Sequence, residues 1–227
     1  MLKYLLNLLF PKLCMGCDSL LLQNEIIICT NCNHHLPYTN HHILAGNDTT
    51  KKFYGIIPVE FSAAMLYFHK KGIVQNLIHN LKYKKHQEIG TLLGEWYAKD
   101  LESVANIKTV SEIIPVPLHK KRLEERGYNQ ITTFCEALSN ELKIPYNPNL
   151  LYRNRYSKTQ TKKDKENRKD ITNALFDVHF TETDSNKHFL LVDDVMTSGA
   201  TLEACAKALL KIPNSKVSIV TIAYTQS

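Results

Sequence analysis

An apolar run that ends abruptly in two adjacent carboxylates lies near the C-terminus of this chain. Residues 189–201 read FLLVDDVMTSGAT, so Leu190 to Val192 are followed at once by Asp193 and Asp194. Such a run is typical of a parallel strand that is buried on both faces. Carboxylates can follow it only where the strand leaves the core, and open α/β sheets keep their ligand crevices at that carboxyl end. The sequence therefore predicts an α/β fold with an acidic site for a hydroxyl-rich ligand.

Small and hydroxyl-bearing residues connect this acidic pair to a predicted helix. Residues 197–201 read TSGAT, and apolar residues then recur at helical spacing, at positions 202, 205, 206 and 209. The free N–H groups and the positive dipole end at a helix start favour a phosphate. Carboxylates for vicinal hydroxyls beside amides for a phosphate describe a pocket for a phosphorylated ribose. The alternative is an ordinary strand, turn and helix with one capping Asp, Thr or Ser.

Four of the six cysteines form two CxxC pairs near the N-terminus. They are Cys14 and Cys17, then Cys29 and Cys32 after eleven intervening residues. Paired CxxC motifs are typical of a zinc ribbon, in which four thiolates surround one tetrahedral ion and leave no open position. We therefore expect a structural Zn²⁺ in a module too small to bury a core of its own. A redox dithiol or a pair of disulfides is the alternative. Cys135 and Cys205 instead fall on apolar helix faces, where a thiol packs as a small hydrophobe.

The composition is that of a globular chain, with 44% hydrophobic and 22% charged residues among 227. Residues 1–11 are interrupted by Asn7 and end at Pro11 without a small-residue cleavage site, so we expect a short amphipathic helix and not a signal peptide. No apolar stretch approaches the ~20 residues that a membrane span requires. We therefore expect a cytoplasmic protein without membrane insertion, in which disulfides are disfavoured.

The chain divides into two predicted parts. Residues 1–45 hold the N-terminal helix and the zinc ribbon, and residues 46–227 form the α/β domain. Turn-forming residues predict a linker over 36–52, and apolar periodicity predicts helices that begin near Ile73 and Ile89. Strand-like runs lie at 56–68 and 110–118.

Two segments concentrate positive charge. Residues 118–130 read LHKKRLEERGYNQ and are predicted to be a basic loop between a strand and a helix. Residues 153–169 hold eight basic and two acidic residues, which equals the net charge of +6 of the whole chain. We expect a polar loop there that meets an anionic partner. For any single cation, a solvated surface position is nearly as good an explanation.

The segment 189–201 resembles the signature with which type I phosphoribosyltransferases bind 5-phosphoribosyl-1-pyrophosphate (PRPP). This resemblance implies a mainly parallel sheet flanked by helices, and a Mg²⁺-bound PRPP as ligand. It also implies that Asp193 and Asp194 bind the ribose hydroxyls and serve catalysis, while the glycine loop holds the 5′-phosphate. The implied PRPP site comprises Asp193, Asp194, Val195, Thr197, Ser198, Gly199, Ala200 and Thr201.

The wider pattern resembles the ComF family, competence-associated phosphoribosyltransferase-like proteins with an N-terminal four-cysteine zinc module. The resemblance spans residues 8–11 with the cysteines, 115–130, 153–176 and the PRPP signature, in the family's order. It implies that the first basic loop meets pyrophosphate and that the second forms a hood over the reacting sugar. The implied pyrophosphate contacts are Leu118, Lys120, Lys121, Arg122 and Arg126, and the implied hood contacts are Arg153, Arg155, Gln160 and Arg168.

Two functions follow from this resemblance, both linked to natural competence and the uptake of single-stranded DNA. One is transfer of the phosphoribosyl group from PRPP to an acceptor that the sequence does not identify. The other is a non-catalytic module that senses PRPP or binds single-stranded DNA alongside the DNA-uptake machinery. Tyr152 and Tyr156 offer faces on which bases could stack. The charge of residues 153–169 serves either function, since pyrophosphate and the DNA backbone are both anions.

Overall fold

The structure is a computed structural model that describes residues 11–154 and 175–226. The predictions for the N-terminal helix, for Tyr156 and for the hood residues Arg155, Gln160 and Arg168 fall outside the described residues. Arg153 lies within them.

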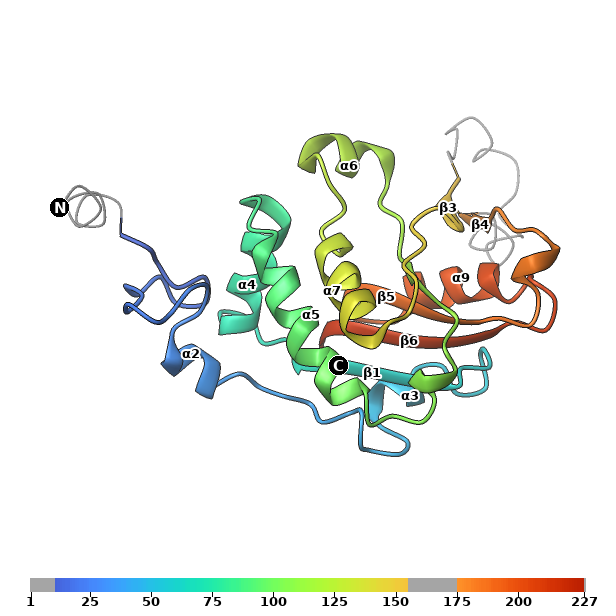
Figure 1. The fold of residues 1–227 in the computed structure, drawn as a ribbon, viewed down its shortest axis with the longest axis horizontal. Helices are drawn as coiled ribbons and strands as arrows, with labels where there is room; N and C mark the ends of the chain where they lie inside the picture. Colours follow the sequence, from blue (N-terminus) through green and yellow to red (C-terminus); the bar gives the residue numbers. More distant parts are fainter. Residues whose placement is uncertain (1–10, 155–174, 227) are drawn as a thin grey trace.

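A four-stranded, fully parallel sheet forms the centre of the protein (Figure 1). Its strand order is β1-β6-β5-β2. The strands are β1 (Phe61–Tyr67), β2 (Glu112–Pro115), β5 (His188–Met196) and β6 (Lys216–Tyr224). The first five residues of β5 are buried, which confirms the strand predicted from its apolar run. The predicted fold class, a mainly parallel α/β sheet with helices, is also confirmed.

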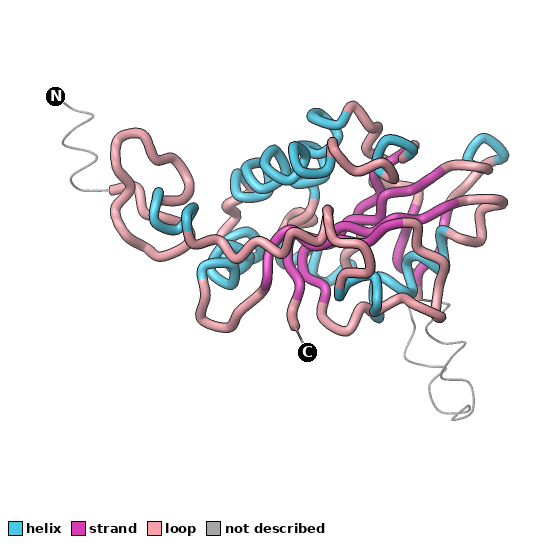
Figure 2. The backbone as a smooth tube through the Cα atoms, turned by 90° about the horizontal axis from the view of Figure 1, so that it is seen from below, coloured by secondary structure: helices cyan, strands magenta, loops and turns pink. Residues whose placement is uncertain are grey.

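Helices cover both faces of this sheet (Figures 1 and 2). On one face, Leu190 and Val192 share a core with α4 (Ile73–Tyr83), α5 (Glu88–Leu101) and α7 (Thr132–Leu142). On the other face, Phe189 and Leu191 pack with α9 (Ala200–Leu209) and with the small antiparallel ribbon. Successive side chains of a strand point to opposite faces, so alternate residues of the apolar run fill the two cores on either side of the sheet.

The remaining elements are short. The antiparallel ribbon consists of β3 (Leu151–Arg153) and β4 (Phe176–Val178). The short helices are α2 (Thr30–His34), α3 (Asp48–Lys51), η1 (Ile107–Thr109), α6 (Lys120–Arg126) and η3 (Glu182–Asp184). The predicted loop 118–130 thus contains helix α6. His119 accepts a hydrogen bond from the Lys121 backbone at its start, and Gly127 ends it with a left-handed φ of 79°.

The segment 36–52 packs against the body and does not behave as a free linker. The Asn47 side chain donates to the carbonyls of His41, Leu44 and Ser62, and Thr39 donates to the carbonyl of Ala64 in β1. Both side chains are buried. Its turn-forming residues satisfy buried backbone groups along the sheet edge, which explains why composition alone suggested a linker.

No helix in the described part of the chain is long and apolar enough to cross a membrane.

Candidate functional site

A cavity of about 390 Å³ opens at the carboxyl ends of β2 and β5. The residues after these two neighbouring strands meet there because the strands are parallel. Its lining includes Val116, Pro117 and Leu118 after β2, and Asp193, Asp194, Val195, Thr197 and Thr201 at and after the end of β5. The remaining lining comes from Phe68, Ile78, Lys82, Arg122, Arg126, Gln130, Arg153 and Thr225.

The two neighbouring aspartates have different environments, because successive side chains of a strand point to opposite faces. Asp194 is buried, and its partners are Lys82 in α4 and Gln130, two positions before α7. Lys82 of α4 lies 2.8 Å from its Oδ1, and the Gln130 amide donates to its Oδ2. Asp194 is therefore a carboxylate whose two oxygens already have protein partners.

Asp193 is half-buried and lies between two hollows. It lines both the large cavity and a smaller space of about 40 Å³ beside residues 195–202. Its Oδ1 accepts a hydrogen bond from the backbone N–H of Asp194 at 2.8 Å. Burial, together with the negative charge of Asp194, raises the pKa of Asp193 to about 8. Hydroxyl donors or positive charge that a ligand brings would stabilise the ionised form of Asp193, which this environment disfavours.

The smaller hollow lies against the turn that starts α9. Gly199 has a φ of 84°, and it serves as the helix N-cap without a side-chain hydrogen bond to the first turn. A Cβ atom at Gly199 would lie 3.4 Å from the Phe53 ring, an ordinary contact, so the positive φ and not a lack of space favours glycine there. Thr197 and Ser198 are exposed beside it. The turn thus presents hydroxyls and the amides of a ten-residue helix to one small space, as an anion-binding turn does.

Four cations line the large cavity together with the two carboxylates. They are Lys82, Arg122, Arg126 and Arg153. Burial and the nearby Arg122 lower the pKa of Arg153, whose buried Nε has no hydrogen-bond partner within the described ranges. Like charges held together in this way favour binding of an anion.

The structure brings together only some of the predicted pyrophosphate contacts. Leu118, Arg122 and Arg126 line the cavity. Lys120 and Lys121 do not, because they lie on the outer face of α6 and pair with Glu124 and Glu125 at 3.5 and 3.9 Å. A helical repeat in place of the expected loop explains why Arg122 and Arg126 line the cavity together, since they stand four positions apart on one face of α6.

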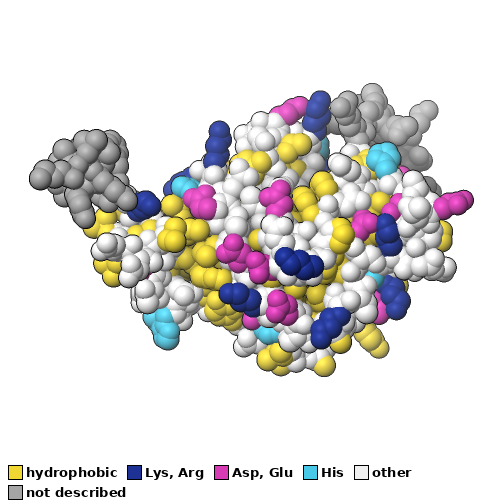
Figure 3. Space-filling model, viewed as in Figure 1, with side chains coloured by type: hydrophobic (Ala, Val, Ile, Leu, Met, Phe, Trp, Pro, Cys, Tyr) yellow, Lys and Arg dark blue, Asp and Glu magenta, His cyan; other side chains and the backbone are white. Residues whose placement is uncertain are grey.

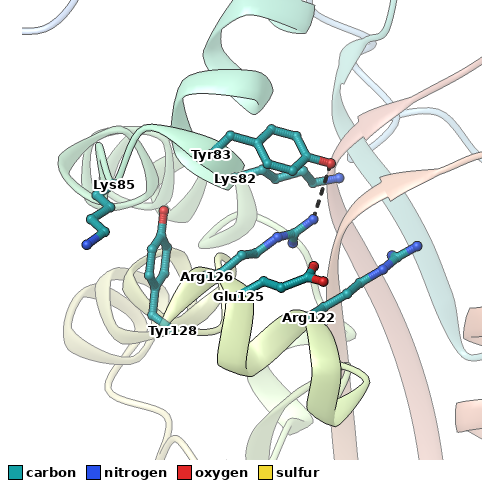
Figure 4. Close-up of a pocket in the computed structure, with 7 residues that line it drawn as sticks. All are labelled: Lys82, Tyr83, Lys85, Arg122, Glu125, Arg126 and Tyr128. Carbon is teal, nitrogen blue, oxygen red and sulfur yellow. Dashed lines mark hydrogen bonds between the residues drawn. The ribbon is translucent and has the colours of Figure 1, made fainter.

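A third pocket, of about 190 Å³, adjoins the large cavity and shares Lys82, Arg122 and Arg126 with it (Figure 4). Two tyrosines contribute to its wall. The Arg126 guanidinium lies 5.0 Å from the centre of the Tyr83 ring, and the Tyr128 hydroxyl donates to the Leu81 carbonyl. Tyr83 is 63% exposed, although the His79 ring also lies 5.1 Å from its ring centre, so much of the tyrosine side chain is open to solvent.

Sequence reasoning assigned no role to Lys82 or Gln130, which complete the site. A continuous network runs from Arg126 through the Gln130 amide to Asp194 and Lys82. Gln130 ends the stretch 115–130 that resembles the ComF family, whereas Lys82 lies in the helix predicted to begin near Ile73. That resemblance was the available signal, because apolar periodicity cannot show which polar residue of a helix reaches a distant strand.

The four N-terminal cysteines form a separate cluster that fits one metal ion. Their Sγ atoms all lie within 4.8 Å of one another, and those of Cys17 and Cys29 are 3.7 Å apart. This distance is close to the edge of about 3.8 Å of a tetrahedron with metal–sulfur bonds of ~2.3 Å. The backbone N–H groups of Gly16 and Cys29 donate to the Cys14 Sγ, as suits a thiolate ligand. The side chains thus provide four soft donors and no disulfide.

Comparison with known families assigns the C-terminal part. Residues 132–227 match the family described as the phosphoribosyl transferase domain. The solved structure of a UMP synthase from Leishmania donovani is similar at 17% identity, with a TM-score of 0.36, over 70% of this chain and 28% of that one. The sheet, the crevice at its carboxyl end and the family match together define a type I phosphoribosyltransferase-like protein.

Relatives with curated names cover more of the chain. Competence protein F from Haemophilus influenzae is 27% identical over 91% of this chain and 88% of its own length. The DNA utilization protein YhgH from Shigella flexneri is 26% identical over 81% of this chain and 78% of its own. Competence protein ComFC from Bacillus subtilis is 34% identical over 44% of this chain and 38% of its own. These matches support the resemblance to the ComF family that the sequence pattern predicted.

Proposed function

We propose that this protein binds Mg²⁺-PRPP in the cavity at the carboxyl end of β5 and transfers its phosphoribosyl group to a nitrogen acceptor. The observation that carries this proposal is the composition of one cavity. Four cations and two carboxylates line a space of about 390 Å³, and beside it lies a helix start whose N-cap, Gly199, has no side chain to bond the first turn. An anionic ligand that also carries hydroxyl donors satisfies both sets of groups.

Different residues would bind different parts of PRPP. Asp193 would accept hydrogen bonds from the ribose hydroxyls, because its environment disfavours a solitary charge. The turn from Thr197 to Thr201 would bind the 5′-phosphate. Asp194 would act mainly by positioning Lys82, since both of its oxygens are already engaged.

The cations would stabilise the leaving group. As the bond between C1 and the pyrophosphate oxygen breaks, its electron pair leaves with pyrophosphate and an acceptor nitrogen bonds to C1. Arg122, Arg126 and Arg153 line the cavity without a carboxylate partner recorded among the described residues. Mg²⁺ would arrive with PRPP and offset the charge that develops on pyrophosphate. Residues 153–169 would form the hood over the reacting sugar, a role that the sequence resemblance alone supports.

We further propose that Cys14, Cys17, Cys29 and Cys32 hold a structural Zn²⁺. A closed set of four thiolates provides no position for a substrate, so the ion would stabilise the module. Reduced thiols and PRPP are both consistent with a protein that works in the cytoplasm. The names of the relatives, which refer to competence and DNA utilization, support a role in handling incoming DNA.

Thermal unfolding with Mg²⁺-PRPP tests ligand binding. We expect the ligand to raise the melting temperature of the wild-type chain, and we expect Asp193→Asn with Asp194→Asn to abolish the rise. Inorganic phosphate at the same ionic strength is the control. A rise that persists unchanged in the double variant would remove these carboxylates from the site. A screen for pyrophosphate release across nucleobases and amines then tests catalysis separately.

Single-stranded DNA binding is the second candidate function, and the tyrosine pocket favours it. The exposed Tyr83 ring, Lys85 and Arg122 combine a stacking face with cations next to the cavity (Figure 4). We expect Tyr83→Ala to weaken binding of a short oligonucleotide, because stacking on one aromatic ring is worth ~1–3 kcal/mol per base. Tyr54→Ala, at a tyrosine that is 88% exposed and does not line the pocket, is the control. Equal losses in the two variants would place the DNA elsewhere.

A further inference from the structure

A cavity of about 510 Å³ lies between the four-cysteine module and helix α5, and it shares no lining residue with the PRPP cavity. Apolar side chains from both sides form its floor. Ile26 comes from the module and is 76% exposed, while Leu92 and Trp96 come from α5 and are half-buried. Figure 3 shows hydrophobic side chains exposed on the face that carries α5, with acidic side chains beside them. We call this cavity the α5 groove.

The charge of the α5 groove is opposite to that of the chain. Its lining includes Glu25, Glu88 and Glu95, and it includes no Lys or Arg among the described residues, although the chain carries a net charge of +6. Glu25 accepts hydrogen bonds from the backbone of Leu22 and Thr30, which are neutral donors, and these bonds lower its pKa. The groove therefore combines an apolar floor with an acidic rim.

The spacing along α5 indicates the shape of an occupant. Glu88, Leu92, Glu95 and Trp96 stand at positions i, i+4, i+7 and i+8, so they lie on one face of the helix. They span about 12 Å, or roughly two helical turns. The opposite face of α5 is packed against α7, where a Cβ on Gly94 would lie 2.6 Å from that of Ala137. The outer face is thus the one available for docking.

We propose that the α5 groove binds an amphipathic helix of a partner protein, with apolar residues on one face and Lys or Arg beside them. Apolar anchors two turns apart would pack on Leu92, Trp96 and Ile26, as helices do in hydrophobic grooves. Basic flanks would pair with Glu88 and Glu95 and give the contact its specificity. Two copies of this chain that met through their α5 grooves would fit less well, because their acidic rims would then oppose each other. The inference does not depend on PRPP binding.

Two designed peptides of 14 residues test the proposal. Both carry Leu at i, i+3, i+4 and i+7, and one fills the other positions with Lys while the other uses Glu. Trp96 is the only tryptophan of the chain, so its fluorescence reports binding at the groove. We expect a saturable change with the Lys peptide and at least ~10-fold weaker binding of the Glu peptide.

Charge reversal provides the matched control. Glu95→Lys should weaken the Lys peptide about 10-fold, and Glu88→Lys with Glu95→Lys should make the Glu peptide the better ligand. Glu124→Lys, on the exposed face of α6, should change neither affinity. Equal binding of the two peptides, no binding of either, or no effect of charge reversal would overturn the proposal. A concentration-dependent dimer that blocks the peptide would show that a second copy occupies the groove.

Discussion

Asp193 combines a proposed role in ligand binding with a cost to stability. Its pKa is raised to about 8 in the folded protein, above the ordinary value of 3.8. Between these two values the folded chain holds a proton that the unfolded chain has lost. The free energy of unfolding therefore falls as the pH rises through this window. Functional sites often carry such unfavourable groups, since the ligand compensates them.

The variant Asp193→Asn should remove this pH dependence. At pH 8.5 without ligand we expect the variant to melt a few degrees above the wild type, where 1 kcal/mol corresponds to about 2–4 °C for a chain of this size. The difference should shrink toward pH 5, because Asp193 is then protonated in the folded protein. Melting curves at several pH values measure both effects. A difference that is constant across this range would show that Asp193 does not titrate in it.

Lys82 neutralises a buried carboxylate, and its loss should be costly. We expect Lys82→Met to lower the free energy of unfolding by about 2–3 kcal/mol, less than for a fully buried pair because the Lys82 side chain is 19% exposed. Adding Asp194→Asn should restore at least about half of this loss. Denaturant unfolding gives the values. Lys51→Met, which breaks the exposed pair with Asp48, should cost less than ~0.5 kcal/mol.

If Lys82→Met lowered the free energy of unfolding as little as Lys51→Met, the ion pair with Lys82 would not be needed to keep Asp194 buried.

The sequence could not predict this pair, because Lys82 and Asp194 are 112 positions apart. It did predict the acidic pair itself, because two carboxylates after a buried strand are a local pattern. Local patterns identify candidate residues, whereas their partners depend on how distant elements pack.

Helix α4 connects the four-cysteine module to the candidate PRPP site. Near its start and middle, Asn76 and Asn80 donate to the carbonyls of Gly16 and Met15, at 2.8 and 2.9 Å. Those two carbonyls lie between Cys14 and Cys17, two of the proposed metal ligands. At its end, Lys82 reaches Asp194. One helix of eleven residues thus contacts both sites.

We expect Asn80→Ala to loosen the metal module. Asn80 is buried, so its loss leaves the Met15 carbonyl without its partner and should cost about 1–2 kcal/mol. A coloured chelator should then remove the metal several-fold faster than from the wild type. Asn106→Ala, which breaks an exposed bond to the Glu60 carbonyl, is the control. Equal release rates in the two variants would show that α4 does not hold the module.

The sequence predicted the helices and strands in which the apolar pattern extends over several turns or a whole strand. The helices expected near Ile73 and Ile89 are α4 and α5, and the expected strand is β5. Helix α6 was not predicted because seven residues without a buried side chain give no periodic signal. Its available signals were Gly127 at its C-terminus and the Lys–Glu spacing of four residues.

As a whole, the protein joins a small module without its own core to a sheet domain. The buried cysteines Cys14, Cys29 and Cys32 belong to the same apolar cluster as α4 and α5. The predicted boundary between residues 45 and 46 stays a prediction, although the packed segment 36–52 indicates that the two parts are closely joined. Composition could not predict this, since buried turns and exposed linkers use the same residues.

Metal removal should therefore affect the whole molecule. We expect one zinc per chain by elemental analysis, and we expect a strong chelator under reducing conditions to lower the melting temperature by several degrees. Cys17→Ser should have the same effect, whereas Cys205→Ser, on the buried face of α9, should leave the zinc content unchanged. Full stability after complete metal removal would contradict a structural ion.

The proposal that β5 ends in a PRPP site is tested most directly by crystals of the protein grown with Mg²⁺-PRPP. We expect the ribose hydroxyls within hydrogen-bond distance of the Asp193 carboxylate, the 5′-phosphate at the turn around Gly199, and the pyrophosphate beside Arg122 and Arg153. Clear density for PRPP at any other place, or well-ordered crystals with water alone in this cavity at saturating ligand, would contradict the proposed function.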